Sequence, residues 1–97
     1  MKVRWAPLAI DRVAEIAAYI AADNPIAAEK WIRNAFARVG QLERFPKSGR
    51  QIPETPRKDI REIIWGNYRI IYRIDSHHVS ILTIRHMKQI LPMEDLK

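Results

Sequence analysis

The sequence contains no cysteine, and this absence excludes disulfide bonds and metal sites built on thiolates. It also lacks any run that approaches the roughly 20 apolar residues of a membrane span. The first residues carry Arg4 and Asp11 around a short apolar stretch, so they lack the uninterrupted apolar segment that a secretory signal needs. We therefore expect a cytoplasmic protein without membrane contacts, whose core holds together without cross-links.

The size and charge of the chain narrow its organisation and its partners. With 97 residues, 47% of them hydrophobic, the chain can build one hydrophobic core, so we predict a single domain over residues 1–97. Seventeen Lys and Arg oppose eleven Asp and Glu, which gives a net charge of +6. Most of this excess lies in the second half of the chain. It favours polyanionic partners, either nucleic acid or an acidic protein segment.

The first half of the chain shows helical periodicity after a short alternating segment. Residues 2–5 alternate in polarity and predict a strand, and Pro7 suits the first turn of a following helix. Asp23-Asn24-Pro25 ends that helix and begins a second one, because Asn24 can cap free N–H groups. Phe45-Pro46 marks the end of the second helix. The apolar stripes are Ala9, Val13, Ile16, Ala17 and Ile20, then Ala28, Trp31, Ala35, Val39 and Leu42.

The second half begins with a loop and continues with strands. Residues 46–59 hold three prolines and Gly49, which indicates a long irregular loop of the kind that often carries function. Residues 60–65, 68–74 and 79–85 are rich in Ile, Tyr and Val and predict three antiparallel strands. Gly66-Asn67 suits a two-residue type II′ turn. We expect residues 87–97 to be a tail that is only partly ordered.

These elements predict an α+β fold in the order β-α-α-β-β-β, with a helical hairpin packed on one face of a small antiparallel sheet. In the middle strand, Tyr68 and Tyr72 fall on the apolar face, where we expect core packing rather than chemistry. Arg69 and Arg73 fall on the other face, which we expect to be partly polar.

Four segments together resemble the RelE/ParE superfamily of toxins from bacterial type II toxin–antitoxin systems, over about residues 3–88. Each segment alone is short and unspecific, but their order and spacing match the family. They are Trp5-Ala6-Pro7 before a helix with Ile16 to Ile20 as I-x-x-Y-I, Leu42 to Arg50 as LERFPKSGR, Ile60-Arg61-Glu62, and Tyr68 to Ile74 followed by Ile81 to His86.

The resemblance implies two alternative mechanisms. RelE-like toxins cut mRNA on the ribosome without a metal, and cleavage needs positive charge at the phosphate together with proton transfer. The candidates for that chemistry are Arg69, His86 and Lys88. However, a pair of Lys found in RelE itself is absent, and Ile60 and Glu62 fall close to those positions. A carboxylate there would repel a phosphate.

ParE-like toxins share the fold and poison DNA gyrase, and we favour this side of the resemblance. No catalytic residue, cofactor or metal is then expected. A basic sheet face would bind the target through Arg61, Arg69, Arg73 and Arg85. The alternative for Arg69 and Arg73 is a merely solvated surface.

The resemblance also implies partners. Both mechanisms imply a cognate acidic antitoxin that folds across an apolar groove and neutralises the basic surface. The target would be DNA gyrase, or alternatively the ribosome and its mRNA, and DNA would be contacted only indirectly through the antitoxin. A further alternative is a non-toxic basic module that binds nucleic acid. The sequence shows no recognition helix, Gly-rich phosphate loop or RRM-type aromatic motif to support it.

Overall fold

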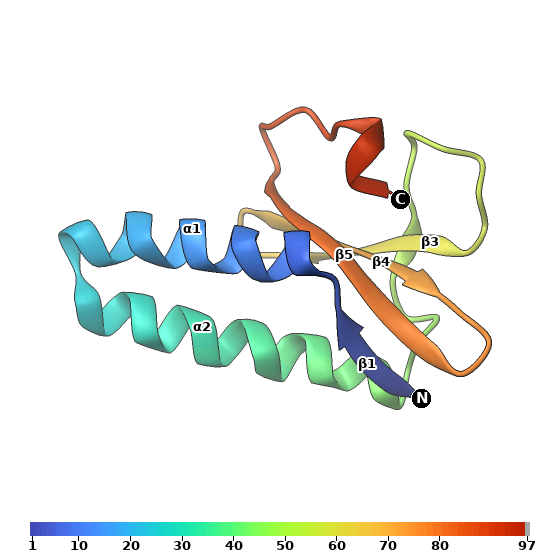
Figure 1. Cartoon of the computed structure of the whole chain (residues 1–97), viewed down its shortest axis with the longest axis horizontal. Helices are drawn as coiled ribbons and strands as arrows, with labels where there is room; N and C mark the ends of the chain where they lie inside the picture. Colours follow the sequence, from blue (N-terminus) through green and yellow to red (C-terminus); the bar gives the residue numbers. More distant parts are fainter. Residues whose placement is uncertain (97) are drawn as a thin grey trace.

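The computed structural model describes residues 1–96 and has the predicted α+β architecture (Figure 1). The helices are α1 (Pro7–Asp23) and α2 (Pro25–Gly40). The strands are β1 (Lys2–Trp5), β2 (Arg50–Gln51), β3 (Ile60–Trp65), β4 (Tyr68–Ile74) and β5 (His78–His86). There are also two short 3-10 helices in the described chain. η1 (Gln41–Glu43) follows α2, and η2 (Met93–Leu96) ends the described chain.

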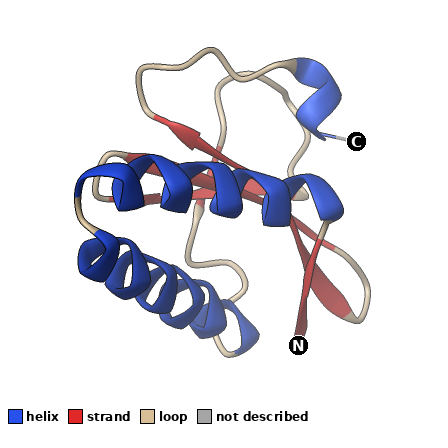
Figure 2. Cartoon of the chain, turned by 60° about the vertical axis from the view of Figure 1, so that its left-hand side comes forward, coloured by secondary structure: helices blue, strands red, loops and turns tan. Residues whose placement is uncertain are grey.

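The helical hairpin forms where the sequence predicts it. Asn24 separates the two helices, and its side-chain oxygen accepts a hydrogen bond from the Ala27 amide at 3.1 Å. Pro25 occupies the first turn of α2, where its missing N–H leaves no bond unmade. Because the connection is so short, α1 and α2 run antiparallel and lie together on one face of the sheet (Figure 2). The predicted helix boundary at residues 23–25 is confirmed.

The sheet contains five strands in the order β1-β5-β4-β3-β2, and it is mixed rather than purely antiparallel. β1 pairs in parallel with β5, with Val3 opposite Val79. The other pairs are antiparallel. The expectation of an antiparallel sheet was therefore wrong at this edge. The parallel edge arises because β1, at the start of the chain, pairs with β5, near its end, and no local sequence pattern encodes such a long-range pairing. The two-residue strand β2 also lies inside the predicted loop 46–59.

The predicted turn between β3 and β4 is present. Gly66 and Asn67 connect the two strands, and Gly66 has a φ of 57°. That conformation is open to glycine and costly for other residues. A positive φ at the first central position is the condition for a type II′ turn, which matches the twist of the adjoining strands.

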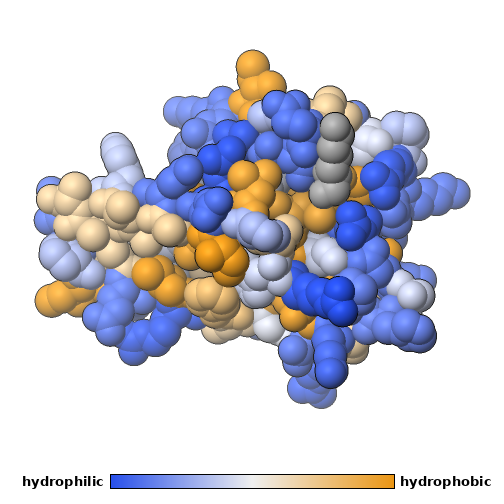
Figure 3. Space-filling model, in the orientation of Figure 1, coloured by the Kyte–Doolittle hydropathy of each residue, from blue (hydrophilic) through white to orange (hydrophobic). Residues whose placement is uncertain are grey.

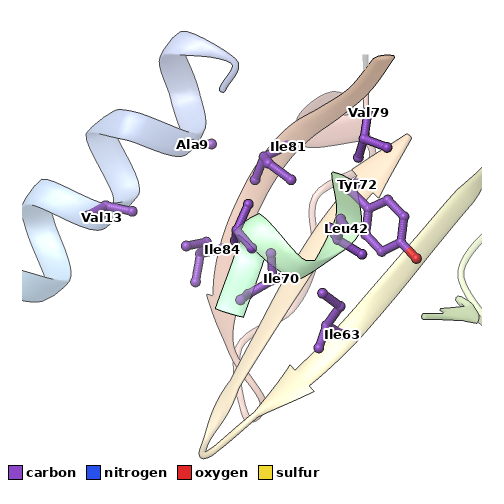
Figure 4. Packing of buried hydrophobic residues seen from close by; sticks show 10 residues of the cluster. Ala9, Val13, Leu42, Ile63, Ile70, Tyr72, Val79, Ile81 and Ile84 are labelled. Atoms are coloured by element: carbon purple, nitrogen blue, oxygen red, sulfur yellow. The ribbon is translucent and has the colours of Figure 1, made fainter. Parts of the chain in front are cut away.

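The main core lies between the helices and the sheet. It includes Ala9 and Val13 of α1, Leu42 of η1, and Ile70 and Tyr72 of β4 (Figure 4). Trp31 of α2 packs against Trp65 and Tyr68, with ring centroids 5.5 Å away in each case. The prediction that Tyr68 and Tyr72 serve the core is confirmed.

A second, smaller cluster covers the opposite face of the sheet. Its members are Ile52, Ile60, Ile71, Leu82, Leu91 and Leu96. A bulge in the β4–β5 pairing leaves Leu82 without a partner, because Ile71 faces Thr83 and Tyr72 faces Ile81. The last described residues pack here through Leu91 and Leu96, so residues 87–96 make more contacts than their mixed sequence indicates.

Candidate functional site

Arg69 lies at the centre of a charged network on the second face of the sheet. Its guanidinium donates to both carboxylate oxygens of Glu54, at 2.6 and 2.8 Å, and its Nε donates to Glu62. The other oxygen of Glu62 accepts from Arg50 at 2.7 Å. Arg69 is 8% exposed and Glu62 is 1% exposed. The four residues therefore alternate in charge from the loop into the sheet.

This network neutralises Arg69 inside the fold. Hydrogen bonding to Glu54 raises the pKa of Arg69 above its usual value, with a further contribution from Glu62. In return, the hydrogen bond from Arg69 lowers the pKa of Glu54 below its usual value, against the opposing effect of burial. Both partners stay ionised at neutral pH. The positive charge is thus already engaged and holds the loop at Glu54 against β4.

The three residues considered for RNA cleavage do not come together in one site. Tyr68 pairs with His86 and Arg69 pairs with Arg85 across β4 and β5. Side chains alternate between faces along a strand, so Arg69 and His86 point to opposite faces of the sheet. The His86 ring meets Tyr68 edge-on at 5.6 Å, and its Nδ1 accepts from the Lys88 amide. The Lys88 side chain is exposed.

Two further arginines of the predicted target-binding set are also paired with carboxylates. Arg73 donates to Asp75 at 2.7 Å, and this bond lowers the pKa of Asp75 below its usual value. Arg85 donates twice to one oxygen of Asp95, at 3.0 and 3.1 Å. Asp95 is buried and also lies within hydrogen-bond distance of Thr83. The sequence does not reveal this pairing, because Asp95 lies in a segment without periodicity.

Arg61, the remaining member of that set, belongs to a second assembly on the helix side of the sheet. Its guanidinium donates to the carbonyl of Gly49 at 2.8 Å. The buried hydroxyl of Tyr72 accepts from the Gly49 amide at 2.9 Å and donates to the Pro46 carbonyl at 2.7 Å. Burial raises the pKa of Tyr72 above its usual value. Tyr72 therefore fixes both ends of the turn at residues 46–49, a role that the sequence analysis missed.

A groove of about 470 Å³ runs between α1 and β5. Its lining is Arg12, Glu15, Ile16 and Tyr19 from α1, with Tyr68, Ile84, Arg85, His86 and Gln89 from the sheet side. Tyr19 is 83% exposed. β1 ends opposite Ile81, so β5 continues beyond the end of β1 on that side of the sheet. In the view of Figure 3, apolar surface gathers over the helices, whereas the opposite end is mainly hydrophilic.

Two features are absent from the described part of the chain. Within residues 1–96, no group of three His, Asp or Glu side chains is arranged to hold a metal ion. No described helix is long and apolar enough to cross a membrane.

Comparison with known proteins places these features in a family. A family model described as the ParE toxin of the type II toxin–antitoxin system parDE matches residues 3–91. The protein Y4kP of Sinorhizobium fredii is 38% identical over 93 residues, which are 94% of this chain and 93% of that protein.

Two solved structures share the fold. One is from the chromosomal ParDE toxin–antitoxin system of P. aeruginosa, with a TM-score of 0.74 and 19% identity over 89% of this chain and 95% of that one. The other is from the toxin–antitoxin complex RelBE2 of Mycobacterium tuberculosis, with a TM-score of 0.56 and 24% identity over 88% of each chain. The match of the family model over residues 3–91 decides the assignment. The chain belongs to the ParE family of toxins from type II toxin–antitoxin systems.

Proposed function

We propose that this toxin inhibits growth by poisoning DNA gyrase in the cytoplasm, and that a cognate acidic antitoxin neutralises it. Family membership supports a ParE-like target. The observation that carries the choice against RNA cleavage is the separation of the candidate residues. Arg69 points away from His86, and its charge is taken up by Glu54 and Glu62. A pentavalent phosphate next to His86 would find no charge from Arg69 to stabilise it.

The predicted target-binding arginines divide by what holds them. Arg69 and Arg85 are mostly covered and are bound to carboxylates of the loop and of the C-terminal segment. We propose that these two arginines hold the loop and the C-terminal segment in place and do not contact the target. Arg61 forms no salt bridge within residues 1–96, and Arg73 keeps more of its side chain accessible than Arg69 does. We therefore propose that Arg61 and Arg73 contact the target directly.

Inhibition of supercoiling tests this proposal. Purified toxin should inhibit DNA supercoiling by gyrase and cause cleaved DNA to accumulate. Arg61→Ala and Arg73→Ala should each weaken inhibition about fivefold, the effect of about 1 kcal/mol at an interface. Arg33→Ala, on the exposed side of α2, serves as the control and should inhibit like the parent protein.

The outcomes separate the alternatives. If folded toxin leaves gyrase unaffected and instead cuts mRNA in a ribosome-dependent translation reaction, the RelE-like mechanism replaces this proposal. If gyrase is inhibited but neither arginine variant is weaker, the surface assignment is wrong while the target stands.

We place the antitoxin in the groove between α1 and β5. Its walls combine the apolar Ile16, Tyr19 and Ile84 with the cationic Arg12 and Arg85. An amphipathic acidic segment can bury its apolar side chains there and bring a carboxylate that competes with the exposed Glu15 for Arg12, whereas Arg85 stays bound to Asp95. Binding would also cover Tyr19, which otherwise leaves a large apolar surface in water.

Replacement of Tyr19 by alanine should weaken antitoxin binding about tenfold or more, because exposed aromatic side chains that become buried dominate interface energies. Titration calorimetry with the antitoxin encoded beside the toxin would measure the change. Ile26→Ala is a matched control, since Ile26 is also highly exposed and lies outside the groove. Equal affinities for both variants and the parent protein would place the antitoxin elsewhere.

A further inference from the structure

The loop at residues 44–50 displays an aromatic ring among cations. Its sequence is Arg-Phe-Pro-Lys-Ser-Gly-Arg, with three basic residues and no acidic one. Phe45 is 60% exposed, although phenylalanine is normally buried. Arg44 lies over the face of this ring, with 5.8 Å between its guanidinium carbon and the ring centroid.

Backbone hydrogen bonds and Tyr72 hold the loop in one conformation, and Phe45 is exposed in that conformation. The amides of Arg44 and Phe45 donate to the carbonyl of Gln41, at 3.2 and 3.0 Å. The Ser48 amide closes a turn on the Phe45 carbonyl at 3.1 Å. Tyr72 then bonds the loop at Pro46 and Gly49, as described above. A rigid aromatic side chain loses little entropy when it binds a partner.

Two cations of the loop, Arg44 beside the ring and Lys47, remain available to a partner. Within residues 1–96, Arg44 and Lys47 form no salt bridge, whereas Arg50 is engaged with Glu62. Arg38 and Arg61 also form none, but they donate hydrogen bonds to the Gln41 side chain and the Gly49 carbonyl. Arg61 reaches the loop through the Gly49 carbonyl, and Arg38 is close enough to influence the Tyr72 hydroxyl. Glu43 precedes the loop, but the free cations outnumber it.

We propose that the 44–50 loop binds single-stranded DNA directly, with Phe45 stacking on an unpaired base and Lys47 and Arg44 contacting phosphates. A base offers a flat π-face to the exposed ring, and the strand offers regularly spaced negative charges to the free cations. A duplex hides its base faces and would satisfy only the charges. This contact goes beyond gyrase inhibition, because it requires no gyrase.

Binding of fluorescently labelled oligo(dT) to purified toxin, followed by anisotropy over a series of salt concentrations, tests the proposal. Phe45→Ala should weaken binding roughly 5- to 150-fold, the range for loss of one stacked base. Phe45→Trp should retain binding, and Phe45→Leu should not. Log affinity falls as log salt rises, and Lys47→Ala should make this dependence less steep, by about 0.7 in the slope.

Two exposed residues of the helical hairpin provide control variants for this experiment. Ile26→Ala and Lys30→Ala, on the helical hairpin away from the loop, should bind oligo(dT) like the parent protein. Circular dichroism confirms that each variant is folded. Absence of oligo(dT) binding, or unchanged binding by Phe45→Ala, overturns the proposal.

A gyrase assay on the same variants keeps this inference separate from the proposed target. If Phe45→Ala binds oligo(dT) normally yet no longer inhibits gyrase, the loop docks on protein and the DNA proposal is wrong. If the parent protein binds oligo(dT) through Phe45 but leaves gyrase unaffected, the loop binds DNA as proposed and the gyrase target falls.

Discussion

Replacement of Arg69 by methionine is expected to lower the free energy of unfolding by about 3 to 5 kcal/mol, the usual cost of breaking a buried ion pair from one side. The substitution removes the guanidinium that donates hydrogen bonds to both Glu54 and Glu62. Glu62 is almost fully buried, and Arg50 alone would have to neutralise it. Urea unfolding followed by circular dichroism measures the loss.

The control for this experiment is Arg33→Met on α2. Arg33 also pairs with a carboxylate, Glu29, but at 3.5 Å and with both side chains largely exposed. Exposed pairs contribute at most about 1 kcal/mol. Arg33→Met should therefore unfold nearly like the parent protein. Equal stability of the two variants would show that the network around Arg69 does not hold the loop.

A double variant separates the lost ion pair from lost packing. Glu62→Gln removes the buried charge that Arg69→Met leaves without its partner, so the double variant should be more stable than the sum of the two single changes predicts. Simple additivity would mean that the carboxylate does not depend on Arg69. Loss of growth inhibition in Arg69→Met would then report unfolding and not a catalytic role, which is why stability has to be measured first.

The local elements of this fold follow from the sequence because their causes are local. The stripe from Ala9 to Ile20, the cap at Asn24 and the glycine at position 66 each act within a few residues. Each was predicted where it lies. The alternation of β4 also placed Tyr72 in the core and Arg69 on the opposite face.

Long-range partners could not be predicted in the same way. Arg69 was expected at a partly polar surface, but Glu54 lies 15 residues away in a loop without periodicity. Which carboxylate reaches the arginine depends on how the loop crosses the sheet. The parallel pairing of Val3 with Val79 has the same origin. The spacing of residues along a strand predicts which face of the sheet a side chain occupies, but the partner that it contacts there depends on the assembled fold.

Glycine substitutions at positions 49 and 40 should change stability in opposite directions. A Cβ atom on Gly49 would lie 2.5 Å from both the Glu62 carbonyl and the Tyr72 hydroxyl, closer than unstrained atoms approach. Both groups are fixed by backbone pairing or burial. We expect Gly49→Ala to lower the free energy of unfolding by about 3 kcal/mol, at the upper end of overpacking effects.

Gly40 provides the matched control. A Cβ atom there meets nothing within 4 Å, and the residue ends α2 in helical conformation. Gly40→Ala should therefore raise stability by up to about 1 kcal/mol through helix propensity. If both alanine variants were destabilised alike, the close approach at Gly49 would not be the cause.

Combination of Gly49→Ala with Tyr72→Phe tests the mechanism of the larger effect. Tyr72→Phe alone should cost about 1 to 3 kcal/mol, because it leaves the Gly49 amide and the Pro46 carbonyl without their partner. The same change removes one of the three atoms that the new methyl group would strike, and it leaves the Glu62 carbonyl and the Tyr72 ring carbon in place. The two losses should therefore add to less than their sum in urea unfolding. Full additivity would mean that the turn at residues 46–49 adjusts to the methyl group without pressing on Tyr72.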